Sequence, residues 1–297
     1  MTSRHDPRWS KCLDLIEYSI DGISKIRSLL MTVESYLDRI SYTGGLAPTL
    51  FNLNHLHLAH LQTVPFENLY ITLARRFDLE LPAILDKIVN HRRGGFCYEL
   101  NSAFAWLLAQ IGFKVELLSA RTFDGKSLSP EFDHMLLLVN TDQPVIADVG
   151  FGDSFLLPMI AGSAACFQFD RYYRLLNNAE KWLLQQRFGA GDWQSLYIFE
   201  MKSHSLNQFE SMCEYHQTSQ ASIFTRKTVC SRATETGRIT YANGLFIEND
   251  RGHRRETMIP NEASLGEILY DRFGINFCTD ELKHLISAYS RHQSVTQ

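Results

Sequence analysis

The middle third of the chain restricts the possible fold most, because strand-like segments follow one another there without a helix between them. Six segments rich in apolar and β-branched residues lie at 115–121, 132–140, 145–149, 172–177, 181–186 and 193–197. Turn residues separate them, as in the Thr-Asp-Gln-Pro run at 141–144. A parallel sheet needs long crossovers, usually helices, between its strands. The sequence therefore predicts an antiparallel sheet or barrel in this region.

Helical patterns dominate on the amino-terminal side of this region, and helices mix with strands on the other side. Apolar residues recur at helical spacing in the segments 31–37, 52–62, 81–90, 101–111, 206–217, 264–273 and 280–290. Strands are predicted at 224–230 and 237–241, and Asn243-Gly244 predicts a hairpin turn after the second of them. The fold class is therefore α+β, with residues 31–112 mostly helical, 113–205 forming the sheet or barrel, and 206–297 mixed.

Residues 1–30 stand apart from this pattern. Their large apolar residues recur at threes and fours, which favours a helix, but Gly22 disfavours it. A fresh helix pattern begins at Met31. We expect residues 1–30 to be an N-terminal extension without a part in the chemistry.

Composition and charge exclude several classes of protein. A formal net charge of −4 without a basic stripe gives no support for nucleic-acid binding. The sequence contains no run of eighteen apolar residues, so no membrane span is predicted. Its first residues lack the apolar core of a secretory signal. The six cysteines show no CxxC spacing, so neither a disulfide framework nor a zinc site is expected. A reducing cytoplasm is the simplest compartment.

One cysteine stands in a distinctive context. The run from Arg92 to Asn101 places two glycines before Cys97 and an amphipathic stretch after it. Cys97 is therefore expected in the first turn of a helix, where unpaired amides and the helix dipole favour an anion and help a thiol to ionise. This predicts a nucleophile, although a buried structural cysteine is the alternative.

A catalytic cysteine needs a base, and the base benefits from an orienting carboxylate. Among 11 histidines, His134 interrupts the most apolar strand of the chain. Asp133 is adjacent but should face the opposite side of the strand, whereas Asp148 ends the next strand. The alternatives are a core histidine bonded to the backbone and an aspartate of the turn at Gly150-Phe151-Gly152. His57 and His60 share a helix face but lack a third metal ligand, so we expect surface or capping histidines and no metal site.

Glu67 lies between apolar residues in the run Val64–Leu69. A buried carboxylate there would need a partner, and Arg92 or Arg93 could supply it. The alternative is an ordinary exposed glutamate in a loop.

Together these motifs resemble those of the arylamine N-acetyltransferases. The matching runs are Val64–Leu69, Arg93–Glu99, Asp133–Met135, Ala147–Gly152, His216–Ser219, Phe224–Lys227 and Gly237–Thr240. The resemblance extends from about Met31 to near the carboxyl terminus. Residues 1–30 have no counterpart, and Ser219–Ser222 lacks a proline that the family often has, which leaves substrate selectivity open.

The resemblance implies a fold and a set of sites. The fold would be an N-terminal helical bundle (31–112), a central antiparallel β-barrel (113–205) and a C-terminal α/β lid with a connecting helix (206–297). The implied catalytic residues are Cys97, His134 and Asp148, and Glu67 with Arg93 would form a structural ion pair. The implied substrate-binding residues are Phe66, Phe151 and Phe224, and Gly152 would lie where acyl-CoA approaches.

The implied reaction transfers an acetyl group from acetyl-CoA, as co-substrate, to an aromatic amine or hydrazine through an acetyl-cysteine. No tightly bound cofactor is expected, and the chain would be a monomer or a homodimer. Two alternatives remain: a cysteine hydrolase or transglutaminase-like enzyme with the same triad, and a non-catalytic protein that binds an aromatic ligand.

Overall fold

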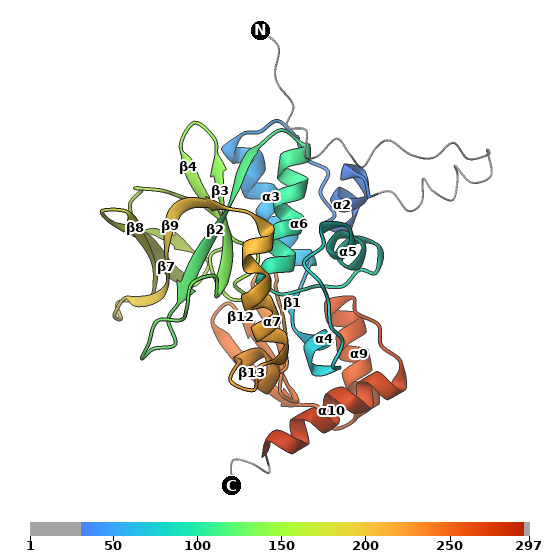
Figure 1. Ribbon diagram of the computed structural model, residues 1–297. Helices are drawn as coiled ribbons and strands as arrows, with labels where there is room; N and C mark the ends of the chain where they lie inside the picture. The colour runs from blue at the N-terminus through green and yellow to red at the C-terminus, as the bar shows by residue number, and fades with distance from the viewer. Residues whose placement is uncertain (1–30, 294–297) are drawn as a thin grey trace, which may run out of the picture. The chain divides into compact units, whose positions relative to one another are not determined.

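The computed structural model describes residues 31–293, with side chains described as far as residue 287. The helix that the sequence favours within residues 1–30 lies outside these described residues. Val33–Gln297 group into one unit by their internal contacts (Figure 1). Its first elements are α2 (Val33–Arg39), α3 (Leu50–Thr63), β1 (Phe66–Glu67), α4 (Leu69–Thr72), α5 (Leu81–Leu85), the π-helical turn η2 (Asp86–Asn90) and α6 (Cys97–Gln110).

The middle of the chain forms the predicted antiparallel sheet. Its strands are β2 (Lys114–Thr122), β3 (His134–Asn140), β4 (Pro144–Ala147), β5 (Met159–Ile160), β6 (Cys166–Gln168), β7 (Arg171–Asn178), β8 (Lys181–Phe188) and β9 (Gln194–His204). They lie in the order β5-β4-β3-β2-β9-β8-β7-β6 and curl around one apolar core. The two ends of the sheet come close to each other, because the Gln168 side chain of β6 donates to the backbone carbonyl of Leu157, just before β5, at 3.0 Å. The result is a curled antiparallel sheet, one of the two arrangements that the segment pattern predicts.

A second sheet follows after a connecting helix. The connection is η3 (Leu206–Phe209), α7 (Glu210–Thr218) and α8 (Ile223–Arg226), and the later elements are β10 (Val229–Ala233), β11 (Gly237–Ala242), β12 (Leu245–Asp250), β13 (His253–Met258), α9 (Glu262–Phe273) and α10 (Thr279–Gln293). The sheet order is β1-β10-β11-β12-β13. Strand β1 from the helical segment therefore pairs with β10, which ties the two regions together.

Helix α6 lies between the helical segment and the eight-stranded sheet (Figure 1). It packs against β2 and β3 on one side and against α5 and α2 on the other. Ten of its residues are buried, Cys97 and Asn101 among them. The helix that carries the candidate nucleophile is thus held on both sides by apolar packing.

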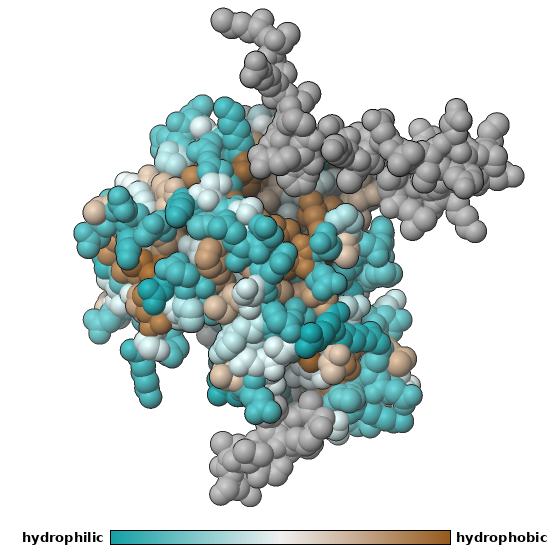
Figure 2. Space-filling model, viewed as in Figure 1, coloured by the Kyte–Doolittle hydropathy of each residue, from teal (hydrophilic) through white to brown (hydrophobic). Residues whose placement is uncertain are grey.

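The surface in the view of Figure 2 is mostly hydrophilic, with hydrophobic side chains exposed in smaller areas between. Phe167 of β6 and Phe188 of β8 are among the exposed hydrophobic residues of the described chain. In the part of the chain that the structure describes, none of the helices combines the length and apolarity needed to cross a bilayer.

Two predictions about local structure were wrong. The segment 224–230 is not one strand: α8 covers Ile223–Arg226, and β10 begins only at Val229. The Ser222 side chain accepts a hydrogen bond from the Phe224 amide and so caps a short helix that apolar pattern alone does not reveal. His57 and His60 are not surface residues, since both are fully buried on the inner face of α3. The Asn243-Gly244 hairpin is confirmed, and it joins β11 to β12.

A buried ion pair stands directly before the cysteine helix. Arg93 Nη2 lies 2.6 Å from Glu67 Oε1, and both side chains are almost completely buried. Of the two arginines considered from the sequence, Arg93 is therefore the partner. Burial raises the pKa of Glu67, but the charges of Arg93 and Lys87 and the Leu69 amide outweigh it, so that this pKa lies below its usual value.

Arg93→Met is expected to lower the free energy of unfolding by roughly 3–5 kcal/mol, because it leaves the Glu67 charge buried without a partner. The Glu67→Gln/Arg93→Met double variant should be less destabilised. Since the pKa of Glu67 is lowered, the stabilisation in the wild type is present at neutral pH and is lost as the pH falls through that lowered value.

Urea unfolding followed by circular dichroism measures these differences. The control is Arg92→Met, at an exposed neighbouring position, where a change within about 0.5 kcal/mol is expected. A double variant as unstable as Arg93→Met alone would contradict the explanation by an unpaired charge.

Candidate active site

Cys97 is the first residue of α6, as the sequence predicts. The two glycines before it leave no room for a side chain, Gly94 against backbone and Gly95 against the Glu99 side chain. A Cβ on Gly94 would lie 1.9 Å from the Pro65 carbonyl oxygen, and one on Gly95 would lie 2.7 Å from Glu99 Oε2. Glu99 in turn accepts a hydrogen bond from the Phe96 amide at 3.2 Å, which satisfies one free amide at the helix start.

His134 begins β3, and Asp148 follows the end of β4. His134 Nε2 lies 2.7 Å from Asp148 Oδ2, and both side chains are buried. Tyr98, the residue after Cys97, donates its hydroxyl to the Phe132 carbonyl at 2.7 Å and so fixes the approach to β3. The structure therefore brings together the histidine and the aspartate that the sequence singles out.

Asp148 accepts hydrogen bonds at both carboxylate oxygens. Besides His134, the Tyr197 hydroxyl reaches Oδ2 at 3.1 Å, while Asn101 Nδ2 at 3.1 Å and the Gly150 amide at 2.9 Å reach Oδ1. Burial alone would raise the pKa of Asp148, but the attraction to His134 and these hydrogen bonds hold it below its usual value. The carboxylate therefore stays charged at neutral pH and orients the imidazole.

Cys97 lies against the segment that carries Asp148. A Cβ placed on Gly150 would be only 2.6 Å from the Cys97 Cα, so the chain after Asp148 touches the start of α6. One helical turn after Cys97, the Asn101 side chain binds the Met135 carbonyl at 2.7 Å as well as Asp148. A single helix face thus holds the cysteine beside both the strand of His134 and the turn of Asp148.

The ionisation of Cys97 differs from the prediction. A helix start was expected to make the thiol ionise more easily, but burial raises the pKa of Cys97, and the charges of Asp133 and Asp148 raise it further. A hydrogen bond to the Met135 backbone opposes this without reversing it. Cys97 is only 3% exposed, so water would solvate a thiolate there poorly. Cys97 therefore depends on a base to give up its proton.

Three supporting residues were missed by the sequence analysis: Asn101, Tyr197 and His57. The His57 Nε2 accepts a hydrogen bond from the Asp148 amide at 3.1 Å, and Nδ1 lies 2.8 Å from the Leu156 carbonyl. Burial lowers the pKa of His57 to about 4, so it stays neutral and can accept that bond. Of the three, only Asn101 could have been found from the sequence, because it follows Cys97 by four positions and therefore lies on the same face of the helix.

The three phenylalanines named from the sequence lie near one another and are all half-buried. The Phe151 ring meets the His134 ring edge-on with centroids 5.2 Å apart, and the Phe66 and Phe224 rings are 6.1 Å apart. Gly152, which follows Phe151, lies beside Phe66, since a Cβ on Gly152 would be 3.2 Å from the Phe66 ring. The Phe151–His134 contact and the Phe66–Phe224 contact are therefore neighbours. These aromatic surfaces flank the cysteine helix and remain accessible in part.

Asp133 faces away from His134, as expected for neighbouring strand residues. It contacts His216 Nε2 at 3.3 Å and the Thr122 hydroxyl at 2.5 Å instead. His216 Nδ1 also lies 3.1 Å from Ser222 Oγ, the cap of α8. The Asp133–His216 pair thus connects α7, the helix before Phe224, with the eight-stranded sheet.

Among residues 31–293 no three histidine, cysteine or acidic side chains come together in an arrangement that could hold a metal ion.

Comparison with known proteins shows the family of the chain. A family model described as N-acetyltransferase matches residues 49–282. The arylamine N-acetyltransferase / N-hydroxyarylamine O-acetyltransferase of Salmonella typhimurium is 32% identical over 277 residues, which cover 88% of this chain and 97% of that protein. The arylamine N-acetyltransferase of Escherichia coli is 31% identical over 270 residues, with 86% and 96% covered. The chain belongs to the arylamine N-acetyltransferase family and is an acyltransferase.

Solved structures share the fold. The Salmonella typhimurium arylamine N-acetyltransferase superposes with a TM-score of 0.81 at 32% identity and covers 87% of this chain and 100% of its own. The Mycobacterium marinum enzyme in complex with CoA gives a TM-score of 0.79 at 27% identity, with 88% and 99% covered. The α+β fold predicted from the sequence is therefore confirmed.

Replacing His134 by alanine is expected to slow alkylation of Cys97 by iodoacetamide at pH 7 roughly 100-fold. Burial raises the pKa of Cys97, so without the imidazole the thiol keeps its proton at neutral pH. The rate in the variant should increase as the pH is raised, because a larger fraction of the thiol ionises.

Peptide mass spectrometry follows the modification at Cys97 itself, since Cys278 is exposed and also reacts. His55→Ala, at an exposed position of α3, serves as the control and should react like the wild type. Equal rates for His134→Ala and wild type at pH 7 would show that the thiol needs no base.

Proposed function

We propose that this enzyme transfers the acetyl group of acetyl-CoA to the nitrogen of arylamines or arylhydrazines in a ping-pong reaction through an acetyl-Cys97 intermediate. The relatives described above are named arylamine N-acetyltransferases, and one related structure is a complex with CoA. The observation that carries the proposal is the buried His134–Asp148 pair, held at 2.7 Å beside the helix that begins with Cys97.

In the first half-reaction, His134 takes the proton of Cys97 and the thiolate attacks the thioester carbonyl. The sulfur of Cys97 forms a bond to the acetyl carbon, and the bond to the CoA sulfur breaks. The departing CoA thiolate receives a proton from the imidazolium. Because one thioester replaces another, the exchange is close to balanced in free energy, and the acetyl-enzyme can accumulate.

In the second half-reaction, an arylamine attacks the acetyl carbon of acetyl-Cys97. Neutral His134 accepts the proton of the attacking nitrogen, and Cys97 leaves as the thiol or thiolate. Arylamines suit this step because their low basicity leaves the nitrogen unprotonated at neutral pH. Phe66, Phe151 and Phe224 would bind the aromatic ring, since half-buried phenylalanines offer faces and edges for stacking.

Gly152 is proposed as the place where the acyl-CoA approaches Cys97. Its φ of +88° is a conformation that glycine adopts readily, and a side chain there would meet Phe66. The donor can therefore come close to the backbone. No tightly bound cofactor is needed, because the acetyl group arrives on CoA and leaves on the amine.

The same pair of residues could serve a hydrolase, in which water discharges the acyl-cysteine. The clustered phenylalanines favour an aromatic acceptor instead, because their apolar surface holds a ring and disfavours ordered water. We infer a cytoplasmic enzyme, since Cys97 must stay reduced. A monomer or a homodimer is compatible with the proposal.

Cys97→Ser is expected to lose nearly all activity with acetyl-CoA and an arylamine, a loss on the order of 10³-fold or more, because a serine hydroxyl is a poor nucleophile near pH 7 without stronger activation. The wild type should give parallel lines in double-reciprocal plots when the amine concentration is varied at several acetyl-CoA concentrations.

Cys278→Ser, at an exposed position, is the matched control and should retain wild-type turnover. Intersecting lines would favour a ternary complex over the acetyl-enzyme. Turnover by Cys97→Ser close to that of the wild type would exclude Cys97 as the nucleophile.

A further inference from the structure

The loop at residues 150–154 touches each member of the proposed site. Gly150 packs on the Cα of Cys97, and its amide binds Asp148. The Phe151 ring meets the His134 ring at 5.2 Å. A loop in this place must be held firmly, because a shift of its backbone would change the space beside the thiol.

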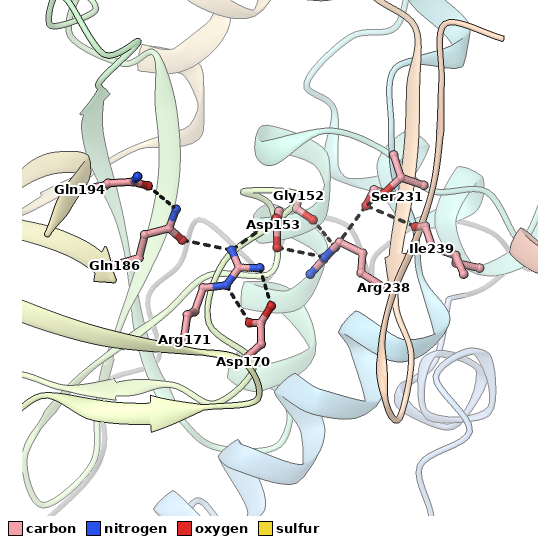
Figure 3. Close-up of polar contacts among 10 residues, drawn as sticks. Gly152, Asp153, Asp170, Arg171, Gln186, Gln194, Ser231, Arg238 and Ile239 are labelled. Carbon is pink, nitrogen blue, oxygen red and sulfur yellow. Dashed lines mark hydrogen bonds and ion pairs between the residues drawn. The ribbon is translucent and has the colours of Figure 1, made fainter. Parts of the chain in front are cut away.

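Arg238 of β11 holds this loop from the five-stranded sheet (Figure 3). Its Nη1 donates to the Gly152 carbonyl and to Ser231 Oγ, the latter at 3.2 Å. Its Nε lies 3.1 Å from Asp153 Oδ1. One guanidinium thus binds two successive residues of the loop, directly after Phe151.

Arg171 of β7 holds the same loop from the eight-stranded sheet. Its Nη1 lies 3.4 Å from Asp153 Oδ2, and its Nε lies 2.8 Å from Asp170 Oδ1. Asp153 is therefore shared by two arginines from the two sheets, as Figure 3 shows. Of these two arginines, however, Arg238 alone binds the backbone of Gly152.

The environment of Arg238 makes its contacts to the loop strong. Its side chain is 14% exposed, whereas the Asp153 side chain is 54% exposed. Burial lowers the pKa of Arg238, and Asp153 opposes this. A hydrogen bond from a guanidinium that is mostly removed from water is stronger than one in water, and loss of Arg238 would leave the Gly152 carbonyl without this donor.

We propose that Arg238 is a positioning residue for the acylation step, which sets the backbone of Gly152 so that the acyl-CoA thioester reaches Cys97 in a productive orientation. This inference rests on the proposed function, in which the donor approaches at Gly152. Arg238 acts through the loop and does not take part in proton transfer.

The contacts separate this role from activation of the thiol. Among the described residues, Arg238 forms its polar contacts with Gly152, Asp153 and Ser231. Replacing Arg238 removes no donor to the His134–Asp148 pair: Asn101 and Tyr197 lie outside the loop, and the Gly150 amide donates two residues before Gly152. Loss of Arg238 should therefore impair the geometry of the donor and leave the proton transfer from Cys97 to His134 unchanged.

The test compares Arg238→Met with Arg171→Met. Both variants remove one largely buried arginine and one contact to Asp153, but only Arg238→Met removes the donor to the Gly152 carbonyl. Single-turnover acetylation of Cys97 by acetyl-CoA, followed by intact-protein mass spectrometry, should be roughly 10- to 100-fold slower in Arg238→Met. Arg171→Met should stay within about 3-fold of the wild type, because misplacement of the donor is not expected there.

Alkylation of Cys97 by iodoacetamide between pH 6 and 9 supplies the second readout. The proposal predicts that Arg238→Met matches the wild type in both rate and pH profile. Arg238→Lys keeps the charge but cannot bind the Gly152 carbonyl and Asp153 at once. Its Cys97 should therefore be acetylated at an intermediate rate. If Arg238→Met does not fold, the same comparison is made between Arg238→Lys and Arg171→Lys.

Three results would overturn the proposal: unchanged acetylation in Arg238→Met, equal slowing in the two methionine variants, or a parallel fall in acetylation and alkylation. The last two would indicate a general structural role. Failure of the wild type itself to become acetylated would instead contradict the proposed function, so the two failures are distinguishable.

Discussion

The carboxylate of Asp148 is the group on which the arrangement of the site depends. It is 1% exposed, and a buried charge of this kind is tolerated only with several partners. Those partners come from separate parts of the chain: His134 on β3, Asn101 on α6 and Tyr197 on β9. Satisfying one charge therefore fixes the helix of Cys97 against the curled sheet.

The same requirement explains the glycines around the site. Gly94 and Gly150 each lie so close to neighbouring backbone that a Cβ would overlap it. Helix α6 can approach the turn after Asp148 only because Gly150 carries no side chain, and Gly94 lets the chain before α6 pass close to Pro65. The close approach also buries Cys97, and this burial raises the pKa of its thiol.

Much of this could be predicted from the sequence. Strands without intervening helices indicated the antiparallel sheet, and Cys97, His134 and Asp148 stood out because each is a polar group in an apolar or glycine-rich setting. Tyr197 and His57 could not be found in this way, since their roles arise from contacts with Asp148 across 49 and 91 residues. The sign of the Cys97 pKa shift was also missed, because the sequence shows the start of a helix but not how deeply the thiol is buried.

If Cys97 carries the acetyl group between the two substrates, it must become acetylated when the donor alone is present. Intact-protein mass spectrometry after incubation with acetyl-CoA and without amine measures this. One added acetyl group is expected on the wild type and none on Cys97→Ala, and aniline should discharge the adduct completely. No adduct on the wild type, or an adduct that only water removes, would contradict this role of Cys97.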